Sequence, residues 1–104
     1  MQADIVEKRD ALSEICRRYG VARLEVFGSA ARVADFDPEH SDVDFLVTFE
    51  PVVRNDLVAF VDFKEALQQL LKRPVDLVER EAVEASRNHI RRRAILNQAI
   101  TVYG

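Results

Sequence analysis

Hydrophobic and polar residues alternate along this chain with two periods, one typical of helices and one typical of strands. Helical spacing predicts three long helices, over residues 5–19, 55–71 and 87–99. Short β-prone runs predict four strands, over residues 21–27, 42–49, 75–78 and 100–103. Between the first two strands we expect a short helical turn at residues 30–32 and a polar loop at residues 34–41. This order of elements predicts a small sheet covered by helices.

The second long helix, at residues 55–71, carries apolar side chains on more than one stripe of its surface. A helix of this kind is buried on two sides, either within its own domain or against a partner. The pattern alone does not choose between these, so assembly into a homo- or hetero-oligomer stays open.

Length and composition agree with a globular protein. The chain has 104 residues, of which 48% are hydrophobic, and we expect a single domain over residues 1–104. No apolar run approaches the roughly 20 residues that span a bilayer, and the first residues lack the apolar stretch of a signal peptide. We therefore expect a cytoplasmic protein without a membrane partner. Cys16 is the single cysteine, which excludes an intramolecular disulfide, and its place on the apolar side of the first helix predicts a core residue.

The net charge is −3, which argues against a surface devoted to nucleic acid. Four arginines nevertheless crowd the last predicted helix, namely Arg87, Arg91, Arg92 and Arg93. A cluster of this kind is commonly a solvated helix face. As a functional patch it would bind ATP phosphates, an acidic partner surface, or RNA held by a partner. Direct nucleic-acid binding by this chain is not expected, because no helix-turn-helix pattern accompanies the arginines.

Two acids lie in the most regular strand of the chain. Asp42 and Asp44 are two residues apart, so their carboxylates point to the same face while Val43 and Phe45 point to the other. Like charges on one face repel, and a divalent cation would remove that repulsion. Hard oxygen ligands suit Mg²⁺. The alternative is a solvent-exposed edge strand that carries two acids without a function.

Two further segments favour the metal-site interpretation. The first predicted strand ends in Phe27-Gly28-Ser29, where a glycine allows close backbone approach to a phosphate. This is neither a Walker A loop nor a dinucleotide fingerprint. Asp76 lies within a later β-prone run. Three carboxylates beside a phosphate-holding turn are typical of two-metal phosphoryl transfer, in which the third acid can also accept a proton.

These segments together resemble the minimal nucleotidyltransferases of the DNA-polymerase-beta-like superfamily. The resemblance rests on Gly28-Ser29-Ala30-Ala31-Arg32, on Ser41-Asp42-Val43-Asp44-Phe45 and on Val75-Asp76-Leu77. It implies an α/β (α+β) fold with a small mixed sheet flanked by helices, an ATP substrate and two Mg²⁺ ions. By motif position, Asp42, Asp44 and Asp76 would be the catalytic, metal-binding carboxylates. The nucleotide would be bound by Gly28, Ser29, Arg32 and Ser41.

The resemblance also implies a role. Stand-alone proteins of this kind look like the antitoxin half of HEPN/MNT toxin–antitoxin pairs, some of which transfer AMP from ATP to a tyrosine of the partner HEPN toxin. The chain departs from the family pattern at Val33, where a glycine is common, and in a long loop before Asp42. The alternative is an antitoxin that neutralises its partner by stoichiometric binding without catalysis.

Overall fold

The computed structural model of this protein describes residues 3–28 and 43–104, and it contains helices and strands in mixed order. The helices are α1 (Ala3–Glu7), α2 (Arg9–Arg18), α3 (Leu57–Leu71), α4 (Arg80–Glu84) and α5 (His89–Gln98), with a 3₁₀ turn, η3, at Pro51–Val53. The strands are β1 (Val21–Phe27), β2 (Val43–Phe49), β3 (Val75–Glu79) and β4 (Ile100–Tyr103).

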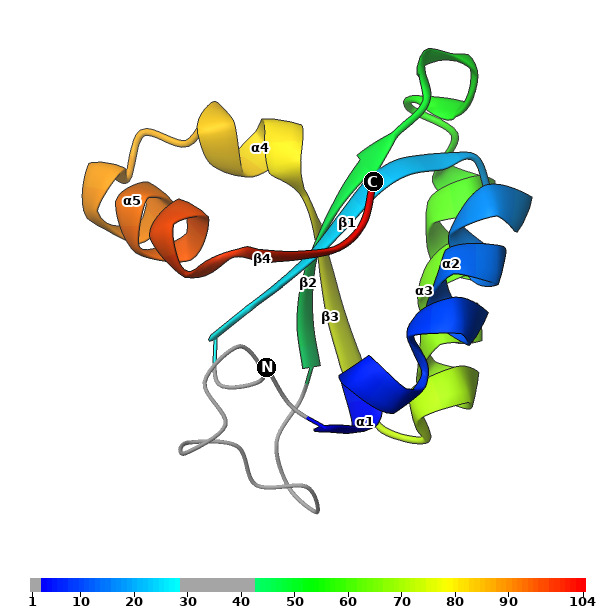
Figure 1. Cartoon of the computed structure of the whole chain (residues 1–104). Coiled ribbons are helices and arrows are strands. Elements are labelled where there is room, and N and C mark those ends of the chain that lie inside the picture. Colours follow the sequence, from blue (N-terminus) through cyan, green and yellow to red (C-terminus); the bar gives the residue numbers. More distant parts are fainter. Residues whose placement is uncertain (1–2, 29–42) are drawn as a thin grey trace.

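The four strands form one mixed sheet in the order β3-β2-β1-β4. Strand β1 is antiparallel to β2 and to β4, whereas β2 and β3 are parallel. Helices α1, α2 and α3 cover one face of the sheet, and α4 and α5 lie on the other (Figure 1). The predicted α+β fold, a small mixed sheet flanked by helices, is therefore confirmed. None of the helices in the described ranges combines the length and the hydropathy needed to cross a membrane.

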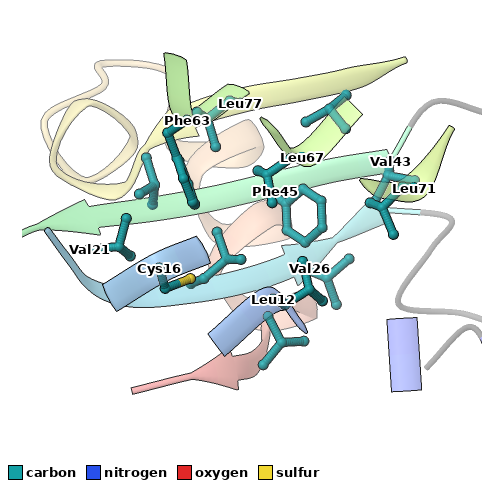
Figure 2. Close-up of a cluster of buried hydrophobic side chains, with 14 of the residues drawn as sticks. Leu12, Cys16, Val21, Val26, Val43, Phe45, Phe63, Leu67, Leu71 and Leu77 are labelled. Carbon is teal, nitrogen blue, oxygen red and sulfur yellow. The ribbon is translucent and has the colours of Figure 1, made fainter. Parts of the chain in front are cut away.

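The larger core fills the space between the sheet and helices α2 and α3. Alternate residues of the strands point into it, as Phe45 does from β2 and Val26 does from β1, and both are fully buried. Phe63 and Leu67 meet them from α3, and Cys16 from α2 (Figure 2). The prediction that Cys16 is a core residue is confirmed, and burial raises the pKa of its thiol to about 12.

A smaller core lies on the opposite face of the sheet. Phe27 and Leu46 point to this side and pack with Val83 of α4 and Ile95 of α5. Side chains alternate along a strand, so residues two positions apart share a face. Asp44, two positions before Leu46, therefore points to this side, and so does Glu25, two positions before Phe27. Asp44 therefore lies on the side of the sheet that α4 and α5 cover in part.

Helix α3 buries only one of its two apolar stripes. Phe63, Leu67 and Leu71 are buried against the sheet, whereas Leu57 and Val58 are 73% and 69% exposed. The Asp56 carboxylate caps the helix by accepting a hydrogen bond from the backbone amide of Ala59. Within the described ranges no other segment packs on the second stripe. The domain itself therefore buries α3 on one side only.

Two local features differ from the predicted elements. The first helix is divided at Lys8, whose ammonium group donates a hydrogen bond to the backbone carbonyl of Leu70 at 2.9 Å. The short helix α4 was not predicted, because five residues are too few to show a helical period. The Lys8 hydrogen bond joins residues 62 positions apart in the sequence.

Candidate functional site

Two of the predicted acids lie side by side on the sheet. Asp44 of β2 and Asp76 of β3 are directly paired in the parallel register, so their Cα atoms are about 4.8 Å apart. Their neighbours Val43, Val75 and Leu77 belong to the larger core, which places both aspartates on the opposite face, towards α4 and α5. Asp44 is half-buried and Asp76 is exposed. The predicted juxtaposition of these two carboxylates is thus present in the fold.

Gly28 brings the end of β1 to the same place. Phe27 pairs with Asp44 across the antiparallel ladder, and the chain leaves the strand at Gly28 with φ of +69°. A Cβ atom at Gly28 would lie 2.6 Å from the Asp44 carboxylate oxygen Oδ2. No side chain larger than hydrogen fits there without moving the carboxylate. The positive φ favours glycine at this position, and a side chain here would displace the Asp44 carboxylate.

Four other predicted residues, Ser29, Arg32, Ser41 and Asp42, lie outside the described residues. Their roles in nucleotide and metal binding stay predictions. Within the described ranges no group of three or more histidine, cysteine, aspartate or glutamate side chains gathers to hold a metal. The two adjacent carboxylates fit a hard divalent cation in donor chemistry, since such ions bind through one or two carboxylates together with substrate phosphates. Asp42 directly precedes β2 and would be the third donor.

A buried acid that the sequence analysis did not single out lies on the same face. Glu25 of β1 is 3% exposed, and its two carboxylate oxygens accept hydrogen bonds from one Arg80 nitrogen at 2.7 and 2.6 Å. Arg23 adds an ion pair at 3.6 Å. The hydrogen bond with Glu25 is the main reason why the pKa of Arg80 is raised above its ordinary value. This contact ties the start of α4 to the sheet, four residues after Asp76.

The cavity beside this ion pair is a poor candidate for nucleotide binding. It has a volume of about 450 Å³ and is lined by Thr48, Glu79, Arg80, Glu81 and Glu84 among others. Thr48 and Glu79 lie at the ends of β2 and β3 that are distant from Asp44 and Asp76. The lining carries three arginines and three glutamates, so it offers no net positive charge to a triphosphate. The paired aspartates therefore remain the candidate site.

Comparison with known proteins gives a matching family model and solved structures of the same fold. A family model described as a nucleotidyltransferase domain matches residues 8–100. A solved structure of a protein proposed to be a minimal nucleotidyltransferase superposes with a TM-score of 0.72 at 34% sequence identity, covering 96% of this chain and 95% of that one. A search of curated proteins found no match.

Two further solved structures share the fold at lower identity. One is a toxin–antitoxin with AMP-PNP, with a TM-score of 0.65, 18% identity, and coverage of 92% of this chain and 73% of that one. The other is a tri-AMPylated HEPN toxin of Shewanella oneidensis in complex with MNT antitoxin, with a TM-score of 0.62, 17% identity, and coverage of 96% and 72%. Both similarities extend over nearly the whole of this chain.

Proposed function

Because this chain belongs to the nucleotidyltransferase family, we propose that it is an Mg²⁺-dependent enzyme that transfers AMP from ATP to a hydroxyl group of a partner protein. The observation that carries the proposal is the pairing of Asp44 with Asp76 on neighbouring strands, with Gly28 against the Asp44 carboxylate. Two carboxylates side by side repel each other unless a cation lies between them. Carboxylates in this arrangement are the oxygen donors that a hard divalent cation uses together with substrate phosphates.

The proposed reaction assigns a separate role to each part of the site. The Gly28-Ser29 turn, with Arg32 and Ser41, binds the phosphates of ATP and aligns the α-phosphorus. Asp42, Asp44 and Asp76 would hold two Mg²⁺ ions, which supply charge neutralisation for the attacking and leaving oxygens. Asp76, the more exposed of the two described acids, accepts the proton of the incoming hydroxyl.

The bonds that change are those at the α-phosphorus. The acceptor oxygen forms a bond to this phosphorus, the bond from the phosphorus to the oxygen bridging to the β-phosphate breaks, and pyrophosphate leaves. The accepting hydroxyl loses its proton to Asp76. The product is a phosphodiester between AMP and the partner, and no oxidant or reductant is needed.

The proposed partner is a HEPN toxin, and the proposed acceptor is one of its tyrosines. Support comes from the solved complex in which a HEPN toxin is tri-AMPylated and bound to an MNT antitoxin of the same fold as this chain. The toxin–antitoxin structure with AMP-PNP supports an adenine nucleotide as the substrate. We expect the reaction in the cytoplasm and the partner in the neighbouring reading frame, recognisable by an R-x4-6-H motif. A neighbouring frame without a HEPN protein would contradict this choice of partner.

The test follows label from ATP to the HEPN protein encoded beside this chain. We expect α-labelled ATP with Mg²⁺ to label the partner, and γ-labelled ATP to leave it unlabelled. Asp44→Asn removes one negative charge from the site at constant shape and is expected to slow transfer by about 100-fold or more. Asp62→Asn is the matched control, since Asp62 is an exposed aspartate of α3 on the opposite side of the sheet.

Three results would contradict the enzymatic proposal. Equal labelling by wild type and Asp44→Asn would remove the aspartate pair from the reaction. Label from the γ-phosphate would show kinase chemistry in place of AMP transfer. Full neutralisation of the toxin by Asp44→Asn without ATP would establish the non-catalytic antitoxin that acts by binding.

A further inference from the structure

Charge is distributed very unevenly along this chain. Residues 85–104 contain four of the fifteen basic residues and none of the eighteen acidic ones, so this segment carries +4 while the rest of the chain carries −7. Most of the segment is helix α5 and strand β4. Three of the four arginines are on α5, and the fourth, Arg87, precedes the helix by two residues.

Only part of this charge serves the internal structure. The Arg92 guanidinium donates hydrogen bonds to the backbone carbonyls of Glu84 and Ser86, both at 3.3 Å, and contacts the His89 ring at 2.8 Å. It thereby joins α4 to α5. Within the described part of the chain, the guanidinium groups of Arg87, Arg91 and Arg93 make no hydrogen bond or ion pair, and all three residues are exposed.

An exposed apolar side chain lies among these arginines. Ile90 is 85% exposed, and with Arg93, Ala94 and Asn97 it lines a shallow hollow on the outer side of α5. We call Arg87, Ile90, Arg91 and Arg93 the α5 basic surface. An apolar residue surrounded by arginines is typical of a protein-binding surface, where the apolar contact is central and charged groups surround it.

The α5 basic surface lies on the same side of the sheet as the paired aspartates. Helix α5 packs on the face of the sheet to which Asp44 and Asp76 point, because its Ile95 contacts the cluster that contains Phe27, the register partner of Asp44. Figure 1 shows α4 and α5 together on that side and α3 on the other. Helix α5 ends at Gln98, and Ile100 then pairs with Val26, one residue before the register partner of Asp44. A protein that covers the length of α5 therefore extends towards the end of the sheet that carries the two aspartates.

The other exposed apolar patch does not offer the same approach. Leu57, Val58 and Val61 lie on α3, which packs against the opposite face of the sheet. A partner seated there would be on the wrong side of the sheet for the paired aspartates.

We infer that the α5 basic surface binds an acidic surface of the protein that accepts AMP, and so positions its hydroxyl at the paired aspartates. This rests on the proposed function. Protein is favoured over RNA by two observations: the rest of the chain carries −7 and would repel a polyanion, and residues 89–98 offer no phenylalanine, tyrosine or tryptophan for base stacking. Opposite charge across an interface speeds association and fixes its orientation.

The test measures binding of the HEPN protein encoded beside this chain, without ATP, by titration calorimetry and stopped-flow association. We expect Arg91→Glu/Arg93→Glu to weaken binding by about 100-fold, mainly through slower association. For wild type, affinity should fall as NaCl rises from about 50 mM to about 500 mM, and this dependence should disappear in the variant. The control Arg9→Glu/Arg17→Glu makes the same charge change on α2 and should bind as wild type does.

Three other results would contradict the docking inference. Unchanged partner affinity in Arg91→Glu/Arg93→Glu, with the same unfolding temperature as wild type, would overturn the inference. Loss of binding to a poly(U) RNA probe with partner affinity retained would make this a nucleic-acid surface. A wild-type dimer that the same variant dissociates would make it a contact between copies of the chain. Ile90→Ser, expected to speed dissociation, keeps the test independent of any charge effect on folding.

The docking inference and the transfer proposal fail separately. Binding that depends on Arg91 and Arg93 without any label transfer would contradict catalysis and leave the docking surface intact. Transfer that continues at the wild-type rate in Arg91→Glu/Arg93→Glu at low partner concentration would contradict the docking surface and leave catalysis intact.

Discussion

The contact between Gly28 and Asp44 leads to the sharpest prediction. Gly28→Ala adds one methyl group at a position where it would lie 2.6 Å from the Asp44 oxygen Oδ2. Ordinary contact begins at 3.4 Å, so the carboxylate must move by roughly 0.8 Å or the end of β1 must move instead. Either movement changes the spacing between the turn that is proposed to bind phosphate and the acid that is proposed to bind metal.

The effect on stability and the effect on activity should differ in size. An alanine with positive φ costs about 1–2 kcal/mol, which corresponds to roughly 5–10 °C in Tm for a chain of this length. A displacement approaching 1 Å in a reacting group lowers the rate by about 100-fold. We therefore expect Gly28→Ala to remain folded at 25 °C while AMP transfer falls by about two orders of magnitude.

Gly20 provides the matched control. Its φ of +71° is nearly that of Gly28, and a Cβ atom there would lie 2.9 Å from Val53 Cγ2. Gly20→Ala should therefore lose a similar amount of stability. Gly20 precedes β1 and Gly28 follows it, so Gly20→Ala changes the end of the strand distant from Asp44 and should keep its transfer rate within about twofold of wild type.

The assay compares thermal unfolding and label transfer for the three proteins, with transfer measured well below the lowest Tm. The reasoning is refuted if Gly28→Ala transfers AMP at the wild-type rate, since Asp44 would then tolerate displacement. It is also refuted if Gly20→Ala loses as much activity as Gly28→Ala, since the loss would then report stability alone.

Two further predictions concern the interior of the fold. Glu25→Ala leaves the Arg80 guanidinium, whose side chain is 24% exposed, without its main partner, and should lower the free energy of unfolding by about 3 kcal/mol in urea titrations. In the Glu25→Ala background, Arg80→Ala should lower the free energy of unfolding by much less than it does in wild type. Strictly additive losses would show that the pair is not coupled. Burial raises the pKa of the Cys16 thiol from 9.0 to about 12, so the folded state holds this proton more tightly than the unfolded state does. The contribution of the protonated thiol to the free energy of unfolding is complete below pH 9 and is lost as the pH rises towards 12. The free energy of unfolding of wild type should accordingly fall more steeply over this interval than that of Cys16→Ala, by up to about 1.4 kcal/mol per pH unit, and parallel curves for the two proteins would contradict it.

The alternation of residues along β2 made part of the site predictable. Val43 and Phe45 had to face a core, so Asp44 had to face away from it. Asp76 could be assigned to a strand in the same way. What the sequence could not supply was the register, in which Asp44 and Asp76 are paired although a whole helix separates them along the chain.

Contacts over long sequence separations account for most of the remainder. Glu25 and Arg80 are 55 residues apart, and nothing local in either segment indicates that they form a buried ion pair. Lys8, at which the first helix divides, likewise donates a hydrogen bond to the carbonyl of Leu70, 62 residues away. The roles of Ser29, Arg32, Ser41 and Asp42 remain predictions from the sequence motif.

The central claim is that Asp44 and Asp76 act as one unit in AMP transfer. The direct test measures the transfer rate of Asp44→Asn, of Asp76→Asn and of the double variant with the same partner and Mg²⁺. Residues that act as a unit are strongly non-additive, so the account predicts that the double variant is no slower than the slower single variant. Losses that multiply, or a wild-type rate in Asp76→Asn, would contradict it.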